Sequence, residues 1–371
     1  MPGRSTSAVA SLRLASCGTV TWLLIKCFLS ATAFVGASGP AGETSAMPSL
    51  LSRVGGPSAV SKLFTPMRRM PPLTSKPIQL SSRGLCAAAG GAKCKLPDGG
   101  SIAVVSREDL FVSEPDPRLF GNEENPKPGS DAATGWTNEN WLKSMFHFEF
   151  AEYMNGPSNF GVLRVMNDDL VQPVRGFGTH PHRDMEILTF VVDGALTHQD
   201  SLDSRETLGR GSIQYMTAGS GVRHSEHNWQ ERPLRFIQSW IVPRRRGLPP
   251  NYGSMVGDEV ATEARRDKWA HYVSDVKGST KTPIQINQDC NVFATELSPD
   301  TAAPVLELQP GRQAYMLCVE GEVFIGADRP LRAHDAAELK GPLSLEAVAG
   351  KSGALVLLFE MALSPHQRSH L

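Results

Sequence analysis

Two series of short apolar runs, each bounded by turn residues, constrain this chain to a β fold. The runs are of strand length and rich in Val, Ile, Phe and Thr, and Gly, Asn, Asp or Pro separate them, a combination typical of strands. Residues 144–243 hold the first series and residues 291–362 the second. Several short strands at regular spacing form sandwiches or barrels, so we expect an all-β protein with two β-domains.

Turn signals suggest how the runs connect. Asp193-Gly194 lies between two apolar runs and predicts a tight hairpin, and Glu320-Gly321 takes the corresponding place in the second series. The main break between the series covers residues 244–282 and is predicted to be helical around Glu259–Trp269. It begins with Arg244–Arg246, which we interpret as a solvated charge run, with a partner-binding patch as the alternative.

Charge divides the 371 residues into two parts. Residues 1–97 hold 11 of the 37 Lys/Arg residues and one of the 38 Asp/Glu residues. The rest of the chain therefore holds 26 basic and 37 acidic residues. The body is therefore acidic, with a balance of −11, and is a poor match for nucleic acid, whose binders are usually basic. We expect no direct nucleic-acid partner. A hydrophobic content of 40% also excludes disorder throughout.

The basic N-terminal part has the composition of a targeting leader. Residues 1–33 combine early arginines, an apolar run and an A-x-A pattern at Ala31–Ala33, as a signal peptide does. Residues 34–98 are basic and rich in Ser and Ala, as transit peptides are. This bipartite order predicts a plastid surrounded by extra membranes and no stable membrane span after processing. The C-terminal Ser369-His370-Leu371 resembles a peroxisomal signal, which is the alternative address.

Two histidine-containing motifs carry the chemistry. The first is Gly-Phe-Gly-Thr-His180-Pro-His182, with Glu186 four residues on, and the second contains His224 and Glu226. Residues i and i+2 of a strand share a face and lie about 6.8 Å apart. His180 and His182 then point the same way, with Glu186 further along that face, and His224 and Glu226 form a second such pair. Three imidazoles and a carboxylate suit Fe, Cu, Ni, Zn or Mn.

Simpler interpretations compete for single residues. A lone His-x-His is more often a surface or hydrogen-bonded pair than a ligand pair, and only the combination of motifs favours a metal. His198 and Asp200 are predicted to be a hydrogen-bonded pair that closes a hairpin, with a substrate contact as the alternative. His227 should point away from the His224 face. Three further residues are assigned to a turn or to core packing: Asn228, Met216 and Phe190.

The motifs resemble those of one protein family. GFGTHPHRDMEILT, LTHQDS, MTAGSGVRHSEHN and the preceding LRVMNDD are similar to the pirin family, especially its bacterial quercetinase-like members. The resemblance implies a bicupin, two cupin β-barrels packed together. It implies an N-terminal metal-binding cupin over 99–250 and a C-terminal cupin without metal ligands over 251–371. Its ligands, carried over by position, are His180, His182, His224 and Glu226, with Glu186 kept as an outer partner.

The second series lacks the histidine pair. Gln313 and Tyr315 stand where His-x-His would fall, so we expect a single metal per chain. The resemblance favours Fe(II), with Cu, Mn, Ni or Zn as alternatives.

Two functions follow from the resemblance. The first is a metal-dependent dioxygenase that opens flavonol-type (quercetin) rings with O2, in which Glu226 is the catalytic base. The second is a non-enzymatic, iron-dependent regulatory module that binds another protein. The leader favours the enzyme, because the regulatory role normally needs a nuclear address. The expected partners are an aromatic flavonol-type substrate and O2, and the expected state is a monomer.

A fluorescent fusion of residues 1–97 should reach a plastid, and these residues should be absent from the mature protein, because leaders of this composition are cleaved after import. Microscopy and N-terminal sequencing measure both. An intact Met1 in the mature protein would contradict the prediction. Peroxisomal targeting that is lost when Ser369–Leu371 is deleted would favour the C-terminal address instead.

Overall fold

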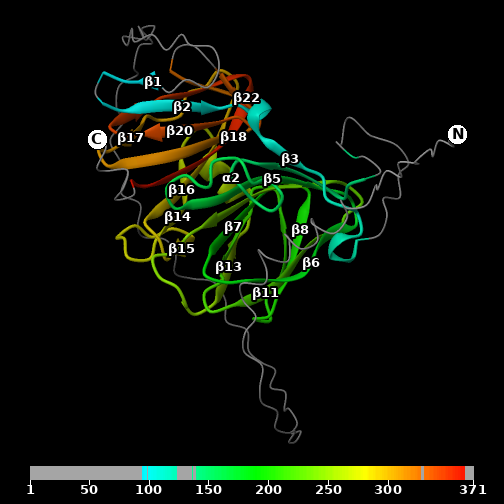
Figure 1. The fold of residues 1–371 in the computed structure, drawn as a ribbon. Coiled ribbons are helices and arrows are strands. Elements are labelled where there is room, and N and C mark those ends of the chain that lie inside the picture. Colours follow the sequence, from blue (N-terminus) through cyan, green and yellow to red (C-terminus); the bar gives the residue numbers. More distant parts are fainter. Residues whose placement is uncertain (1–93, 98, 123–135, 137–138, 327–329, 364–371) are drawn as a thin grey trace, which may run out of the picture. The chain divides into compact units, whose positions relative to one another are not determined.

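The computed structural model describes residues 94–97, 99–122, 136, 139–326 and 330–363. The predicted signal peptide, nearly all of the predicted transit peptide and the C-terminal tripeptide lie outside these residues. In the described ranges no helix has both the length and the apolar character needed to cross a membrane. The secondary structure of the described part is almost entirely β-strand, which confirms the predicted all-β fold (Figure 1).

Two antiparallel sheets form the N-terminal barrel. The larger has seven strands, in spatial order β13 (Asn251–Met255), β10 (Ile213–Thr217), β7 (Glu186–Asp193), β12 (Leu234–Ile241), β5 (Leu163–Val171), β4 (Leu142–Phe146) and β3 (Phe111–Ser113). The smaller has four strands, in the order β6 (Arg175–His182), β11 (Val222–Asn228), β8 (Ala195–Asp200) and β9 (Arg205–Gly209).

The C-terminal barrel also consists of two sheets. Its larger sheet contains, in order, β1 (Cys94–Lys95), β2 (Ser101–Val105), β20 (Ala336–Lys340), β18 (Arg312–Ile325), β22 (Ala347–Ala362), β16 (Cys290–Leu297), β14 (Ala270–Asp275) and β15 (Ile284–Ile286), with β19 (Pro330–Arg332) paired to β18. The other sheet pairs β17 (Leu306–Leu308) with β21 (Leu343–Leu345).

Alternation along the strands builds a core between the barrels. On β7, Leu188 and Phe190 lie in the same buried apolar cluster as Tyr315 and Leu317 of β18. The intervening residues of β18 belong to a different cluster, inside the C-terminal barrel. Successive side chains of a strand point to opposite faces, so each large sheet buries one face in its own barrel and the other against its partner.

Two strands lie on the other side of the predicted domain boundaries. β2 hydrogen-bonds to β20 of the C-terminal barrel and lies beside it in Figure 1, although residues 99–250 were assigned to the N-terminal domain. β13 pairs with β10 of the N-terminal barrel, although it follows residue 250. Cys94 and Lys95, at the end of the predicted transit peptide over 34–98, pair with Ile102 and Ser101.

The predicted hairpin turn at Asp193-Gly194 is wrong. Asp193-Gly194 connects β7 to β8, which belong to different sheets, so it is a corner. Gly194 has a φ of 84°, and a Cβ added to it would lie 2.7 Å from the carbonyl oxygen of Pro233, so the corner itself requires glycine. Glu320-Gly321 lies inside the single strand β18, where the register shifts, so it is a β-bulge.

The predicted helix is present and shorter than expected. The structure has α2 over Glu259–Arg265, within the predicted Glu259–Trp269. The side chain of Asp258 accepts a hydrogen bond from the backbone N–H of Ala261 and caps the helix. At the other end, Trp269 immediately precedes β14, so the chain has already left the helix there.

A buried ion pair lies where the two barrels meet. Arg235 of β12 donates two hydrogen bonds to Asp168 of β5, at 2.9 and 2.7 Å, and a third to the backbone carbonyl of Val319 in β18. Nδ1 of His334 lies 2.7 Å from the same carboxylate. Burial alone would raise the pKa of Asp168, but Arg235 and His334 outweigh it and hold the pKa well below its ordinary value.

Arg235→Ala should lower the free energy of unfolding by about 3–5 kcal/mol, because it leaves the Asp168 carboxylate buried without its charged partner. Chemical denaturation measures the change. The matched control is Arg232→Ala, which removes a pair 3.5 Å from Asp193 whose side chains are 62% and 59% exposed. That change should cost about 0–1 kcal/mol.

The same variant has an expected pH dependence. Because the folded-state pKa of Asp168 is depressed, its pairing stabilises the protein above the unfolded pKa of about 4 and is lost as the pH falls through the folded value. The difference between parent and Arg235→Ala should therefore shrink on acidification below about pH 4. A difference that is the same at pH 7 and pH 3 would contradict this assignment.

Candidate metal centre

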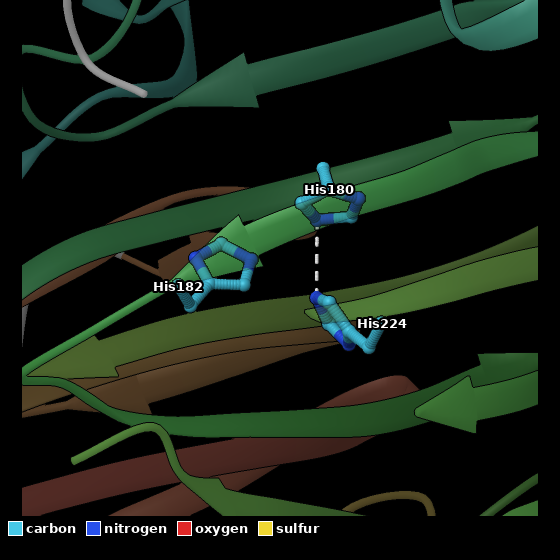
Figure 2. A group of neighbouring side chains, drawn as sticks. All are labelled: His180, His182 and His224. Carbon is cyan, nitrogen blue, oxygen red and sulfur yellow. Dashed lines mark hydrogen bonds between the residues drawn. The ribbon is translucent and has the colours of Figure 1, made fainter. Parts of the chain in front are cut away.

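Strands β6 and β11 bring three predicted histidines together. The strands are antiparallel, and His224 lies directly opposite His180. The potential ligand atoms of His180, His182 and His224 all lie within 4.8 Å of one another, and the three residues are buried. Figure 2 shows the three rings turned toward a common centre.

A β-bulge in β6 makes this convergence possible. His224 pairs with His180, but Glu226, two residues on, pairs with Phe177, three residues back. The extra residue puts both Phe177 and His180 on the inner face, where their rings lie 6.2 Å apart. Gly178 lies in this bulge, and a Cβ there would approach the carbonyl oxygen of Phe120 to 2.5 Å. The second Gly of the motif is thus needed for close packing.

Hydrogen bonding assigns the tautomer of His180. Its Nδ1 lies 2.8 Å from the carbonyl oxygen of Gly178, which can only accept, so Nδ1 carries the proton. Nε2 is then left with a lone pair directed into the barrel, 3.0 Å from Nε2 of His224. Two nitrogens each about 2.1 Å from one ion can lie this close. A backbone carbonyl behind the imidazole is also the usual support of a ligating histidine.

The imidazoles are held in the neutral form that binds metals. Burial lowers the pKa of His180 to about 4. Burial, reinforced by the neighbouring histidines, lowers the pKa values of His182 and His224 well below the ordinary value. Ligation requires neutral imidazole, so no proton has to leave these rings at neutral pH. The donor set therefore fits a divalent transition metal.

Glu226 adjoins this group through His224. It forms a second cluster with His198 and His224, whose ligand atoms also lie within 4.8 Å of one another. Gln214 donates to Oε1 at 2.7 Å and Gln238 to Oε2 at 2.9 Å. Burial raises the pKa of Glu226, although His198 and these donors act in the opposite direction. Its role as a ligand beside the three histidines stays a prediction.

Glu186 lies elsewhere, and the expectation that it shares the face of His180 and His182 is wrong. Thr217 donates to its carboxylate at 2.7 Å and Asn287 at 3.1 Å. A turn at residues 183–185 separates β6 from β7, so the strand alternation does not continue from His182 to Glu186. Neither metal-binding group found in the described residues contains Glu186.

His198 is nearer to the centre than the sequence indicated. Its Nε2 lies 3.0 Å from Asp200, as predicted for a hydrogen-bonded pair. The ring, however, faces His224 with ring centroids 5.3 Å apart and stacks on Tyr252 at 4.3 Å. The same-face spacing of His198 and Asp200 was visible in the sequence. The pairing of β8 with β11, which places His198 opposite Glu226, was not.

Three further predicted sites, His227, Asn228 and Arg244–Arg246, lie outside both metal-binding groups of the described residues. The ring of His227 stacks on Trp229 instead of joining the metal-binding groups, as predicted. Asn228 is a fully buried residue at the end of β11, and its amide donates to three backbone carbonyls. Arg244–Arg246 are exposed, as a solvated run should be, and Arg244 pairs with Asp275.

Core packing is confirmed for the two apolar candidates. Phe190 lies in the cluster between the barrels. Met216 lies in a small cluster on the inner face of the N-terminal barrel, against which Trp240 also packs.

Sequence reasoning missed the polar residues that hold Glu226. Thr189, Gln214 and Gln238 each stand between apolar neighbours or next to one in a strand; Thr189 and Gln214 are buried, and Gln238 is partly buried. A polar residue at an inward position of such a strand is the signal that could have found them. Trp240, whose ring lies 4.8 Å from that of His182, was also missed.

The interior of the C-terminal barrel is apolar, unlike the interior of the N-terminal barrel around the histidines. Ala314, Met316 and Cys318 of β18 belong to its apolar interior. Gln313 and Tyr315 occupy the alternate positions, and Tyr315 belongs to the cluster between the barrels. Gln313 and Tyr315 therefore lie on the face of β18 that points away from the interior of the C-terminal barrel. The expectation that they stand where a His-x-His pair would fall is wrong for this reason. Both metal-binding groups of the described residues lie in the N-terminal barrel.

Comparison with known proteins agrees with this arrangement. The pirin family profile matches residues 129–241, and that of the quercetinase C-terminal cupin domain matches residues 273–361. A pirin-like protein of Caulobacter vibrioides is 35% identical over 60% of this chain and 94% of its own. A quercetin 2,3-dioxygenase of Escherichia coli is 36% identical over 52% of this chain and 80% of its own.

Among solved structures, the bacterial pirin YhhW of Escherichia coli in complex with nickel(II) is similar to this chain. Its TM-score is 0.57 at 27% identity, and the match covers 71% of this chain and all of the other.

Full-length protein should carry one tightly held metal ion per chain that survives desalting, and His180→Ala should lose that ion, because it removes one of three converging imidazoles. Elemental analysis measures the stoichiometry. The control is His271→Ala, since His271 stacks on Phe293 in the C-terminal barrel. Two tightly held ions per chain, or a His180→Ala protein that keeps the parent's metal content, would contradict the prediction.

Proposed function

Since this chain belongs to the pirin family of two-cupin proteins, we propose that it is a metal-dependent dioxygenase that opens flavonol-type rings with O2. One observation carries the proposal: three neutral imidazoles converge beside a buried carboxylate, inside a barrel that also contains clusters of apolar side chains. Three imidazoles suit Fe, Cu, Ni or Zn, and the carboxylate extends the choice to Mn. Fe(II) is the proposed metal. The name of the similar Escherichia coli protein supports the substrate class.

The division of work within the site follows from the positions of the residues. His180, His182 and His224 would hold the ion. When bound, the metal supplies a Lewis acid for the substrate oxygen and the electron chemistry that O2 requires. The chain supplies orientation, a dry environment and a place for the substrate's hydroxyl proton.

Glu226 is the proposed acceptor of that proton. Its carboxylate is fixed by two amide donors and lies next to His224. Burial raises its pKa, which moves a carboxylate toward the range in which it takes protons effectively. Amides donate without carrying charge, so Gln214 and Gln238 hold the group in place and leave its negative charge available.

Aromatic rings beside the histidines fit an aromatic substrate. Trp240 lies edge-on to His182 at 4.8 Å, and Phe150 lies 5.3 Å from Trp240. Phe120 lies edge-on to His180, with ring centroids 5.6 Å apart. Aromatic groups prefer such edge-to-face neighbours, and ligand sites are usually lined by them with few polar groups.

Glu226→Gln should bind flavonol and keep at least part of its metal, but lose about 10²–10⁴-fold in turnover, because an amide of the same shape cannot take the proton. O2 uptake per bound metal, at several pH values, measures the loss. Glu186→Gln is the matched control, since that buried carboxylate bonds Thr217 and Asn287 instead, and it should lose less.

Two outcomes would change the assignment. Near-parental turnover of Glu226→Gln with an inactive Glu186→Gln would exchange the roles of the two carboxylates. If metal-loaded parent protein consumes no O2 with any flavonol, the iron-dependent regulatory module becomes the better hypothesis.

A further inference from the structure

Asn167 of β5 is a buried polar residue to which neither metal binding nor proton transfer gives a role. The residue is 4% exposed. Its side-chain oxygen Oδ1 is buried and has no hydrogen-bond partner within the part of the chain that the structure describes. Buried polar side-chain atoms have a partner in the large majority of cases, so an unpaired acceptor needs an explanation. A ligand that donates a hydrogen bond to it is one.

Strand pairing places Asn167 on the inner face of the N-terminal barrel. Its partner on β12 is Gln238, whose amide donates to Glu226. Residues directly opposite each other in an antiparallel pair have side chains on the same face. The preceding residue, Met166, packs in the cluster between the barrels, as strand alternation requires. Asn167 therefore points into the same interior as Glu226.

Asn167 is the last member of a row of polar side chains that crosses four strands of the seven-stranded sheet. In the order of β10, β7, β12 and β5, the row is Gln214, Thr189, Gln238 and Asn167. The first three members donate hydrogen bonds to Glu226. The next inward residue of β5, Asp169, accepts a hydrogen bond from Ser144. Within this row, Asn167 is the member that has a buried atom without a partner.

Aromatic rings link the position of Asn167 to the histidines. The ring of Trp240 lies 4.8 Å from that of His182, measured between centroids. Phe150 lies 5.3 Å from Trp240 and also 5.3 Å from Phe146. Phe146 lies directly opposite Asn167 on β4. A continuous series of edge-to-face contacts, the arrangement that aromatic groups prefer, thus runs from the three-imidazole group to Asn167.

We propose that Asn167 selects the substrate, and that its Oδ1 accepts a hydrogen bond from a phenolic hydroxyl on the end of the molecule remote from the histidines. An amide oxygen can only accept, so it bonds an O–H group and gains nothing from a C–H group. The substrate class is then a flavonol that carries a hydroxyl on its pendant ring. This inference rests on the proposed flavonol dioxygenase function and gives Asn167 no part in the chemical step.

The test compares two flavonols that differ only in the pendant-ring hydroxyl. Their dissociation constants are measured by fluorescence titration of full-length, metal-loaded protein without O2. The parent should bind the hydroxylated flavonol about 5–10-fold more tightly, the contribution of one hydrogen bond. Asn167→Leu has a side chain of similar size without the amide. It should bind both flavonols equally, because a coupling between two groups disappears when either is removed.

Turnover gives a second readout that a packing defect would not reproduce. With O2 supplied, Asn167→Leu should show a raised KM for the hydroxylated flavonol and an unchanged kcat. A contact remote from the reacting atoms contributes equally to the bound substrate and to the transition state, and its loss therefore changes KM alone. A general disturbance of the barrel would instead weaken the binding of both flavonols alike.

Met166→Leu is the matched control. Met166 is the neighbour of Asn167 on β5, but it lies in the cluster between the barrels, and a change that conserves volume is tolerated there. This variant should keep the parent's preference between the two flavonols. If Asn167→Leu does not fold by circular dichroism, Asn167→Ala replaces it.

The outcomes separate this proposal from the proposed function. A parent that binds and consumes both flavonols equally well overturns the role of Asn167 alone, as does an Asn167→Leu protein that keeps the parent's preference. A metal-loaded parent that binds neither flavonol contradicts the dioxygenase function together with this inference.

Discussion

The seven-stranded sheet has one face against the C-terminal barrel and the other inside the N-terminal barrel. The candidate site depends on this difference between the two faces. One face packs against the C-terminal barrel through residues such as Leu188 and Phe190. The other face presents Thr189, Gln214 and Gln238 to Glu226. Neighbouring positions of one strand therefore serve packing and chemistry in turn, and a slip of one residue would exchange the two faces.

The fold class and the histidine pairs could be predicted because both are local properties of a strand. Apolar runs between turn residues indicate strands wherever they pair, and His180 and His182 share a face on any strand. Partner strands are not a local property. Asp193-Gly194 has the residues of a hairpin turn, yet the flanking strands pair with others, β7 with β10 and β12, and β8 with β9 and β11.

The wrong predictions at the candidate site also arise because strand pairing is not a local property of the sequence. Alternation carried through the turn at 183–185 put Glu186 on the wrong face, because a turn resets the direction of the side chains. The bulge at Gly178 adds a residue to β6, and it shows only in the pairing of β6 with β11. The sequence did not indicate that His198 lies next to the site, because its position opposite Glu226 comes from the pairing of β8 with β11. Spacing predicts a face within one strand, and tertiary pairing decides what that face meets.

Two buried carboxylates illustrate how this sheet separates stability from chemistry. Asp168 faces the other barrel, and the charge of Arg235 compensates its own and helps to hold its pKa low. Glu226 faces the inside of the N-terminal barrel, where amides fix it without charge and burial raises its pKa. A carboxylate paired with arginine has little affinity left for a cation or a proton. One held by neutral donors in a buried site keeps both affinities, and for this physical reason Glu226 is the better candidate for the chemistry.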